Sequence, residues 1–142
     1  MNRTIKFRGK SIYGDGWLLG SLIKIEEDRY AVIPPLNNIE IGKNIGMYEV
    51  CPETVGQFTG LFDKNRKEIY EGDMIVVNDK YPKLVKYIDD YACFCLANIE
   101  DLDEKMDTGY WHQVSPGWWN SSKREIRVIG NIYDHPELIK EE

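Results

Sequence analysis

Four carboxylates gather in the centre of the chain, where they could hold a hard cation or exchange protons. They are Asp63, Glu68, Glu71 and Asp73. Carboxylate oxygens suit Ca²⁺ and Mg²⁺, and paired acids can perform acid–base chemistry. Each of these residues also stands beside a turn, and Asp side chains accept backbone hydrogen bonds that fix turns. We therefore expect turn chemistry here and no metal. The alternative is a metal-dependent hydrolase that uses Asp63, Glu71 and Asp73.

Two cysteines, Cys93 and Cys95, stand two residues apart, so their thiols share one face of a strand. Structural zinc sites use wider spacing and a second ligand pair, and Cys51 and His112 could complete a four-ligand set only by accident of fold. Free cysteine packs as a small hydrophobe, so we expect core or half-buried thiols. Three cysteines is an odd number for a secreted disulfide scaffold, which favours reduced thiols in a cytoplasm.

The remaining signals for catalysis are weak. The chain has two histidines, His112 and His135, and neither lies near a Ser or Cys in a recognised nucleophile motif. The sequence also lacks a Gly-rich phosphate loop of the Walker or dinucleotide kind. We therefore expect no catalytic residues, no cofactor and no enzyme activity.

An aromatic and basic segment near the C-terminus is the best candidate for a binding surface. Its members are Tyr110, Trp111, Trp118, Trp119, Lys123 and Arg124. Trp and Tyr dominate binding hot spots, and aromatic rings beside positive charge suit single-stranded nucleic acid. The alternative is that some of these rings are core and others cover the end of the fold. A nucleic-acid-binding version would use Trp111, Trp118, Trp119 and Arg124.

Composition limits the class of protein that positions these residues. The chain has 142 residues and a net charge of −6, which argues against a general phosphate-binding protein. No apolar run approaches the roughly 20 residues of a membrane helix. The N-terminal residues lack the apolar core of a signal peptide. We expect one domain, or two small dependent ones, in a cytoplasm and away from the membrane.

Short strands separated by turn residues predict an all-β barrel or sandwich. Alternation predicts a half-buried strand at Thr4–Lys10, with Ile5 and Phe7 inward. Further strands are expected at Trp17–Ile25, Tyr30–Ile33, Met47–Val50, Leu84–Tyr91, Tyr91–Ala97 and Glu125–Tyr133. Helix is expected only at Ile99–Thr108, where a mobile acidic loop fits equally well, and at Pro136–Glu141. Trp118 and Trp119 are expected to flank a loop.

The central stretch, Val55–Val77, is the densest run of strand and turn signals. Branched and aromatic residues predict a strand up to Leu61, and Asp63–Arg66 supplies turn chemistry. A second turn at Glu71–Asp73 leads into another strand. We place a boundary near Thr54, which divides the chain into an N-terminal β region, residues 1–54, and a C-terminal region, residues 55–142.

The same stretch carries a family resemblance. The run Val-Gly-Gln-Phe-Thr-Gly-Leu from Val55, with Lys-Glu-Ile-Tyr-Glu-Gly-Asp ending at Asp73, resembles the signature of the YopX family of bacteriophage and prophage proteins. The opening strand and the ending around Val128–Asp134 resemble that family too. The resemblance implies a small SH3-like β-barrel in the C-terminal part and no established catalytic residues. Arg66 departs from the family pattern, which usually has Gly there.

The family resemblance, together with the β pattern and the lack of a catalytic motif, implies a non-enzymatic phage accessory protein in the host cytoplasm. Its partner would be a host or phage macromolecule, and a homo-oligomer is a further possible assembly. Nucleic acid is the alternative partner.

Overall fold

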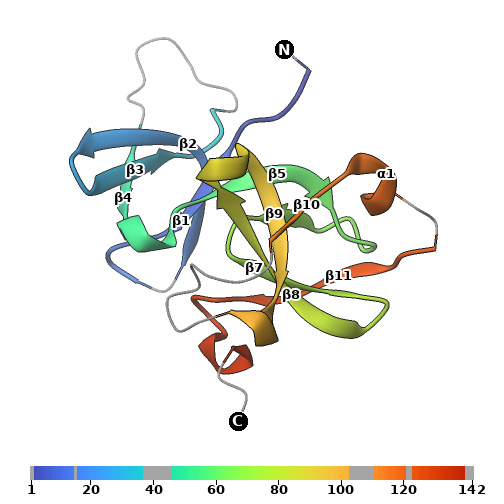
Figure 1. Ribbon diagram of the computed structural model, residues 1–142. Helices are drawn as coiled ribbons and strands as arrows, with labels where there is room; N and C mark the ends of the chain where they lie inside the picture. Colours follow the sequence, from blue (N-terminus) through green and yellow to red (C-terminus); the bar gives the residue numbers. More distant parts are fainter. Residues whose placement is uncertain (1, 15, 37–45, 103–110, 121–122, 140–142) are drawn as a thin grey trace. The chain divides into compact units, whose positions relative to one another are not determined.

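The structure is a computed structural model that describes residues 2–14, 16–36, 46–102, 111–120 and 123–139. Its described residues are mainly β, which confirms the expected fold class, and Figure 1 shows strands through most of the chain. The chain divides into two units, Met1–Gly60 and Leu61–Glu142. The division falls inside a strand, later in the chain than the expected boundary near Thr54. No helix among the described residues is long and apolar enough to cross a membrane.

The N-terminal unit is an antiparallel sheet with the strand order β4-β3-β2-β1-β5. Its strands are β1 (Phe7–Lys10), β2 (Trp17–Glu26), β3 (Arg29–Ile33), β4 (Tyr48–Val50) and β5 (Gly56–Phe62), and the 3₁₀ turn η1 (Pro52–Thr54) precedes β5. β2 pairs with β1 on one side and β3 on the other, as expected of an interior strand. β5 contributes its residues up to Gly60 to this unit.

The expected burial of β1 is wrong at Arg8. Alternation placed Ile5 inward and Arg8 outward, whereas Ile5 is 40% exposed and Arg8 only 8%. The Arg8 guanidinium lies over the ring of Trp17, 4.5 Å from its centroid. A planar guanidinium is weakly hydrated and stacks on aromatic rings, so it can leave water more cheaply than a Lys ammonium can.

The C-terminal unit contains a five-stranded antiparallel sheet with the order β10-β9-β8-β7-β11. Its strands are β7 (Asp73–Val77), β8 (Lys80–Ile88), β9 (Cys93–Asn98), β10 (His112–Gln113) and β11 (Ile126–Asn131); β6 (Glu68–Tyr70) precedes them. The 3₁₀ turn η2 (Asp89–Tyr91) connects β8 to β9. In the described residues this sheet is open, so the expected SH3-like barrel is not confirmed.

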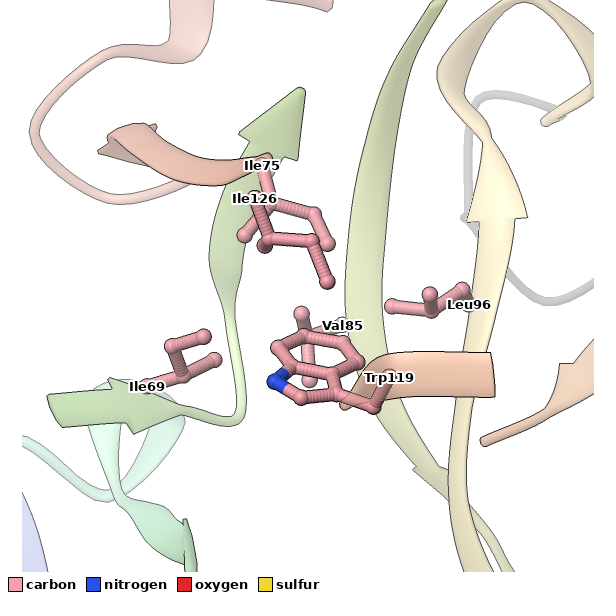
Figure 2. Close-up of a cluster of buried hydrophobic side chains, with 6 residues drawn as sticks. All are labelled: Ile69, Ile75, Val85, Leu96, Trp119 and Ile126. Carbon is pink, nitrogen blue, oxygen red and sulfur yellow. The ribbon is translucent and has the colours of Figure 1, made fainter. Parts of the chain in front are cut away.

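Two apolar clusters occupy opposite faces of this sheet. The first contains Ile69, Ile75, Val85, Leu96, Trp119 and Ile126, which Figure 2 shows converging on the indole of Trp119. The second contains Met74, Leu84 and Ile99. Leu84 and Val85 belong to different clusters because successive side chains of a strand point to opposite faces. Burial on both faces makes β7 and β8 the centre of the unit.

The helix predictions were only partly right. The described part of Ile99–Thr108 is a 3₁₀ turn, η3 (Ile99–Asp101), and residues 103–108 lie outside the described residues. The second expected helix is a 3₁₀ turn, η4 (Pro136–Leu138), while residues 140–141 are likewise not described.

One short α-helix, α1 (Pro116–Trp119), forms where a loop was expected. Ser115 explains it: its Oγ accepts a hydrogen bond from the Trp118 N–H at 3.2 Å, and its carbonyl accepts one from the Trp119 N–H at 3.0 Å. Ser at the N-cap followed by Pro is a helix start signal.

The central hairpin forms as predicted, with a different turn geometry. Asp63 and Lys67 close the loop, since the Asp63 N–H donates to the Lys67 carbonyl at 2.9 Å. Arg66 has a positive φ of 62°, and Asn65 does not share it. A tight turn with both residues at positive φ is therefore excluded. The loop matches a turn followed by a single left-handed residue, the usual three-residue hairpin connection.

Candidate binding pocket

A pocket of about 360 Å³ opens in the C-terminal unit between the sheet and α1. Seven residues line it: Lys83, Leu96, His112, Gln113, Val114, Ser115 and Trp118. Leu96, Val114 and Trp118 make its apolar part, while the other residues supply an ammonium, an imidazole, an amide and a hydroxyl. An apolar pocket with a few polar groups is the usual form of a ligand site.

Strand register brings the pocket residues together. His112 pairs with Leu96 across β10 and β9, so the two side chains lie on the same face. Lys83 on β8 pairs with Asn98, and its Nζ donates to the Asn98 Oδ1 at 2.5 Å. That hydrogen bond holds the ammonium at the sheet surface. Leu96 also belongs to the first apolar cluster, which gives the pocket a rigid floor.

Trp118 is fixed from two sides. It packs against the first apolar cluster, and the Arg124 guanidinium lies 4.8 Å from its ring centroid. Arg124 Nη1 also donates to the Trp118 carbonyl at 3.3 Å. One side chain therefore stacks on the ring and satisfies a carbonyl near the end of α1. This places a second cation beside a residue that lines the pocket.

Among the described residues of the pocket lining, the ionisable ones are Lys83 and His112, and none is a carboxylate. The Lys83 ammonium is opposite in sign to the net charge of the chain, which is −6. A cation in the lining favours an anionic group on a partner.

The predicted aromatic and basic residues do not form one platform. Trp119 is 6% exposed, and its Nε1–H donates to the Phe62 carbonyl at 3.3 Å, so it belongs to the core. Trp111 packs against the second cluster, on the opposite face of the sheet, with Lys86 Nζ 5.9 Å from its ring centroid. Trp118 and Arg124 lie together, Lys123 is exposed, and Tyr110 lies outside the described residues.

The carboxylates of the central stretch fix backbone. Asp63 Oδ1 accepts from the N–H groups of Asn65 and Lys67, and Asp73 Oδ2 accepts from that of Tyr70 at 2.8 Å. Glu71 Oε2 accepts from the Tyr87 N–H at 3.1 Å. This agrees with the expected turn chemistry. In the part of the chain that the structure describes, no three His, Cys, Asp or Glu residues converge to hold a metal ion.

The thiols of Cys93 and Cys95 lie on one face of β9, with their Sγ atoms 3.8 Å apart. Burial, followed by the hydrogen bond and charge of Cys93, raises the pKa of the Cys95 thiol to about 12. All three cysteines are free. Their burial matches the expected core or half-buried thiols.

Most of the pocket residues could not be recognised from the sequence. His112 stood out only as a zinc or triad candidate, and five lining residues did not stand out at all: Lys83, Leu96, Gln113, Val114 and Ser115. Only Ser115, beside Pro116, carried a local signal, because that pair marks a helix start. The other lining residues come together through strand pairing, and the order in which strands pair could not be predicted from the sequence.

The described residues define a small, mainly β protein with two open sheets and an apolar pocket beside α1 in its C-terminal unit. The chain belongs to the YopX family: the family described as "YopX protein" matches residues 6–140. Among solved structures, the protein EF1440 from Enterococcus faecalis is similar to this chain, with a TM-score of 0.59 and 22% identity over 98% of this chain and 100% of that one. That likeness supports the fold alone. No curated protein matches the chain.

Proposed function

We propose that this protein is a non-enzymatic phage accessory protein that binds a host or phage macromolecule in the host cytoplasm. The pocket beside α1 carries the proposal, because it combines an apolar floor with Lys83 and His112. A rigid aromatic residue such as Trp118 supplies large contact area at little cost in conformational entropy. Such a pocket anchors one group of a larger partner.

Contacts of the polar pocket residues favour binding over catalysis. The Ser115 hydroxyl accepts the Trp118 N–H and thereby caps α1. Among the described residues, no hydrogen bond joins His112 to Ser115. A nucleophile is normally activated by a base within hydrogen-bond reach. The pocket polar groups are therefore better suited to orient a partner than to attack one.

We also propose that the C-terminal unit is a barrel of the SH3-like type. Its support is the connectivity: β7, β8, β9 and β10 follow one another as neighbours, and β11 returns to pair with β7. Such an arrangement places the two ends of the sheet on β10 and β11, which would flank the open seam of a partly closed barrel. The pocket would then lie beside that seam, and the edge of β10 would stay accessible.

Nucleic acid remains the second candidate partner, and the pairing of Trp118 with Arg124 favours it. Stacking on Trp118 beside this cation would suit a single-stranded base. Against it stand the core position of Trp119, the separate location of Trp111 and the net charge of −6. A gel shift with single-stranded DNA at increasing salt distinguishes the two, since steep loss of binding with salt is the mark of phosphate contacts.

The main test is affinity capture from infected host cells with a tagged protein and a pocket variant. Lys83→Glu reverses the charge at the pocket, and Lys80→Glu makes the same change on the same strand at an exposed position outside the pocket. We expect Lys80→Glu to recover the same macromolecule as the wild type and Lys83→Glu to lose it. Equal recovery by both variants would refute binding at this pocket.

A further inference from the structure

We infer that the pocket takes an extended acidic peptide segment of a partner protein, which adds to the sheet as a strand beside β10 and inserts one large apolar or aromatic side chain. This inference rests on the proposed function and names the partner chemistry and the binding mode. Three features carry it: the edge of β10, the size of the pocket and its charge.

Among the described residues, the edge of β10 that faces away from β9 has no strand partner for its backbone donor and acceptor. β10 is the last strand of the described sheet order and pairs only with β9 there. The Val114 N–H donates to the carbonyl of Phe94, its antiparallel neighbour, so the backbone N–H and carbonyl of Val114 point towards β9. Because successive residues of a strand alternate in direction, the N–H and carbonyl of Gln113 point away from β9. An extended peptide pairs with such an edge by main-chain hydrogen bonds.

The pocket lies directly beside that edge. Both residues of β10, His112 and Gln113, line it, and Val114 and Ser115 continue the lining towards α1. Its volume of about 360 Å³ is near the lower end of ligand pockets, which run from roughly 300 to 1,000 Å³. That volume also accommodates one large apolar or aromatic side chain of a peptide. In strand addition, pockets beside the edge select alternate side chains of the added strand.

Charge identifies the partner as acidic. Lys83 lines the pocket, Arg124 lies over Trp118, and none of the described lining residues is a carboxylate. An Asp or Glu next to the inserted side chain would face these two cations. Lys83 Nζ uses one of its three donors on Asn98, which leaves others for a carboxylate.

Main-chain pairing separates a peptide from a nucleic acid. A nucleic acid would use Trp118 for stacking and the cations for phosphates, and would gain nothing from the Gln113 backbone. A peptide depends on that backbone. A change to the Gln113 backbone should therefore weaken binding of a peptide and leave binding of a nucleic acid unchanged.

The experiment selects binders from a random peptide library displayed on a carrier, using the intact protein. We expect enrichment of sequences in which an aromatic or large apolar residue stands beside Asp or Glu. A synthetic peptide of the enriched sequence is then titrated against variants at one position. Gln113→Pro removes the outward N–H, which an edge strand tolerates, while Gln113→Ala changes only the side chain.

We expect Gln113→Pro to weaken peptide binding by about tenfold or more, the effect of losing roughly one hydrogen bond, and Gln113→Ala to bind nearly as the wild type does. Thermal melts and one-dimensional proton spectra check that both variants fold. If Gln113→Pro is misfolded, protection of the Gln113 amide from hydrogen exchange in the wild-type complex replaces it as the readout.

Three results overturn the inference: no enriched peptide, enriched peptides without acidic residues, or full binding by a folded Gln113→Pro variant. If affinity capture still depends on Lys83 in those cases, the proposed function stands and the partner is recognised as a folded surface. If affinity capture is also independent of Lys83, both the peptide inference and binding at this pocket are refuted.

Discussion

The Asp63 Oδ2 accepts a hydrogen bond from the Val128 N–H at 3.1 Å, which joins two residues far apart in the sequence of the C-terminal unit. Its other oxygen, Oδ1, accepts from Asn65 and Lys67 within the turn. One carboxylate, only 7% exposed, therefore closes the turn and attaches it to β11. The carbonyl of Ile126 accepts the Lys64 N–H at 2.8 Å and strengthens the same junction.

Asp63→Ala is expected to destabilise the protein by about 1.5–3 kcal/mol, the range for hydrogen bonds to a charged group, because it leaves the N–H groups of Asn65, Lys67 and Val128 without their acceptor. Asp63→Asn should cost less, since one amide oxygen can still accept. Urea unfolding measures both. Glu27→Ala, which removes an exposed partner of Lys24, is the control and should change stability little. Equal effects of Asp63→Ala and Glu27→Ala would contradict the role of Asp63.

Arg66→Gly is expected to stabilise the protein by about 0.5–1 kcal/mol. Arg66 has a φ of 62°, where its Cβ crowds the backbone at a cost of roughly 1–2 kcal/mol. Glycine removes that strain but gains freedom in the unfolded chain, which offsets up to about 1 kcal/mol. Asn65→Gly is the matched control: its φ is not positive, so glycine there should destabilise. A less stable Arg66→Gly variant would show that Arg66 makes a compensating contact.

Trp119→Ala is expected to cost about 3–5 kcal/mol, as truncations of large core residues do. Trp118→Ala should cost clearly less, because Trp118 is half-buried and lies at the edge of the same cluster. Denaturant melts of the two variants compare neighbours in one helix. An equally large loss for Trp118→Ala would make it a core residue and remove it from the binding surface.

Raising the pH above 9 should destabilise the protein through Cys95. Its pKa is raised from 9.0 to about 12 in the folded state, so the unfolded chain releases this proton first. Stability from this group is fully present below pH 9 and is lost as the pH rises towards 12. Urea unfolding at neutral and alkaline pH should show a smaller alkaline loss for Cys95→Ala than for the wild type. Cys51→Ala should retain the wild-type loss.

Local features of the fold could be predicted from the sequence because the responsible residues are neighbours. Asp63 and Asn65 predicted the turn between β5 and β6, and Gly72 predicted the next one, at a φ of 94°. Arg8 shows where the pattern failed. Alternation assumes that a charged side chain faces water, yet this guanidinium stacks on Trp17, a residue of the neighbouring strand.

The pocket could not be predicted because its residues are distant in the chain. Lys83, Leu96 and His112 meet only through the pairing of β8, β9 and β10. Trp118 was correctly singled out as a candidate for binding, but its neighbour Trp119 has the same residue type and a core position. Which of two adjacent tryptophans faces the core depends on the direction of α1, and residue type carries no information about that.

The arrangement of the two indoles in α1 also has an optical consequence. The rings of Trp118 and Trp119 are 6.2 Å apart and inclined at 57°. Chromophores this close and this oblique couple their electronic transitions, which gives a pair of bands of opposite sign in the far ultraviolet. Circular dichroism of this β protein will therefore contain an exciton contribution that belongs to two side chains and not to the backbone. Replacing either indole should abolish that couplet, so the signal can report specifically on how α1 is seated.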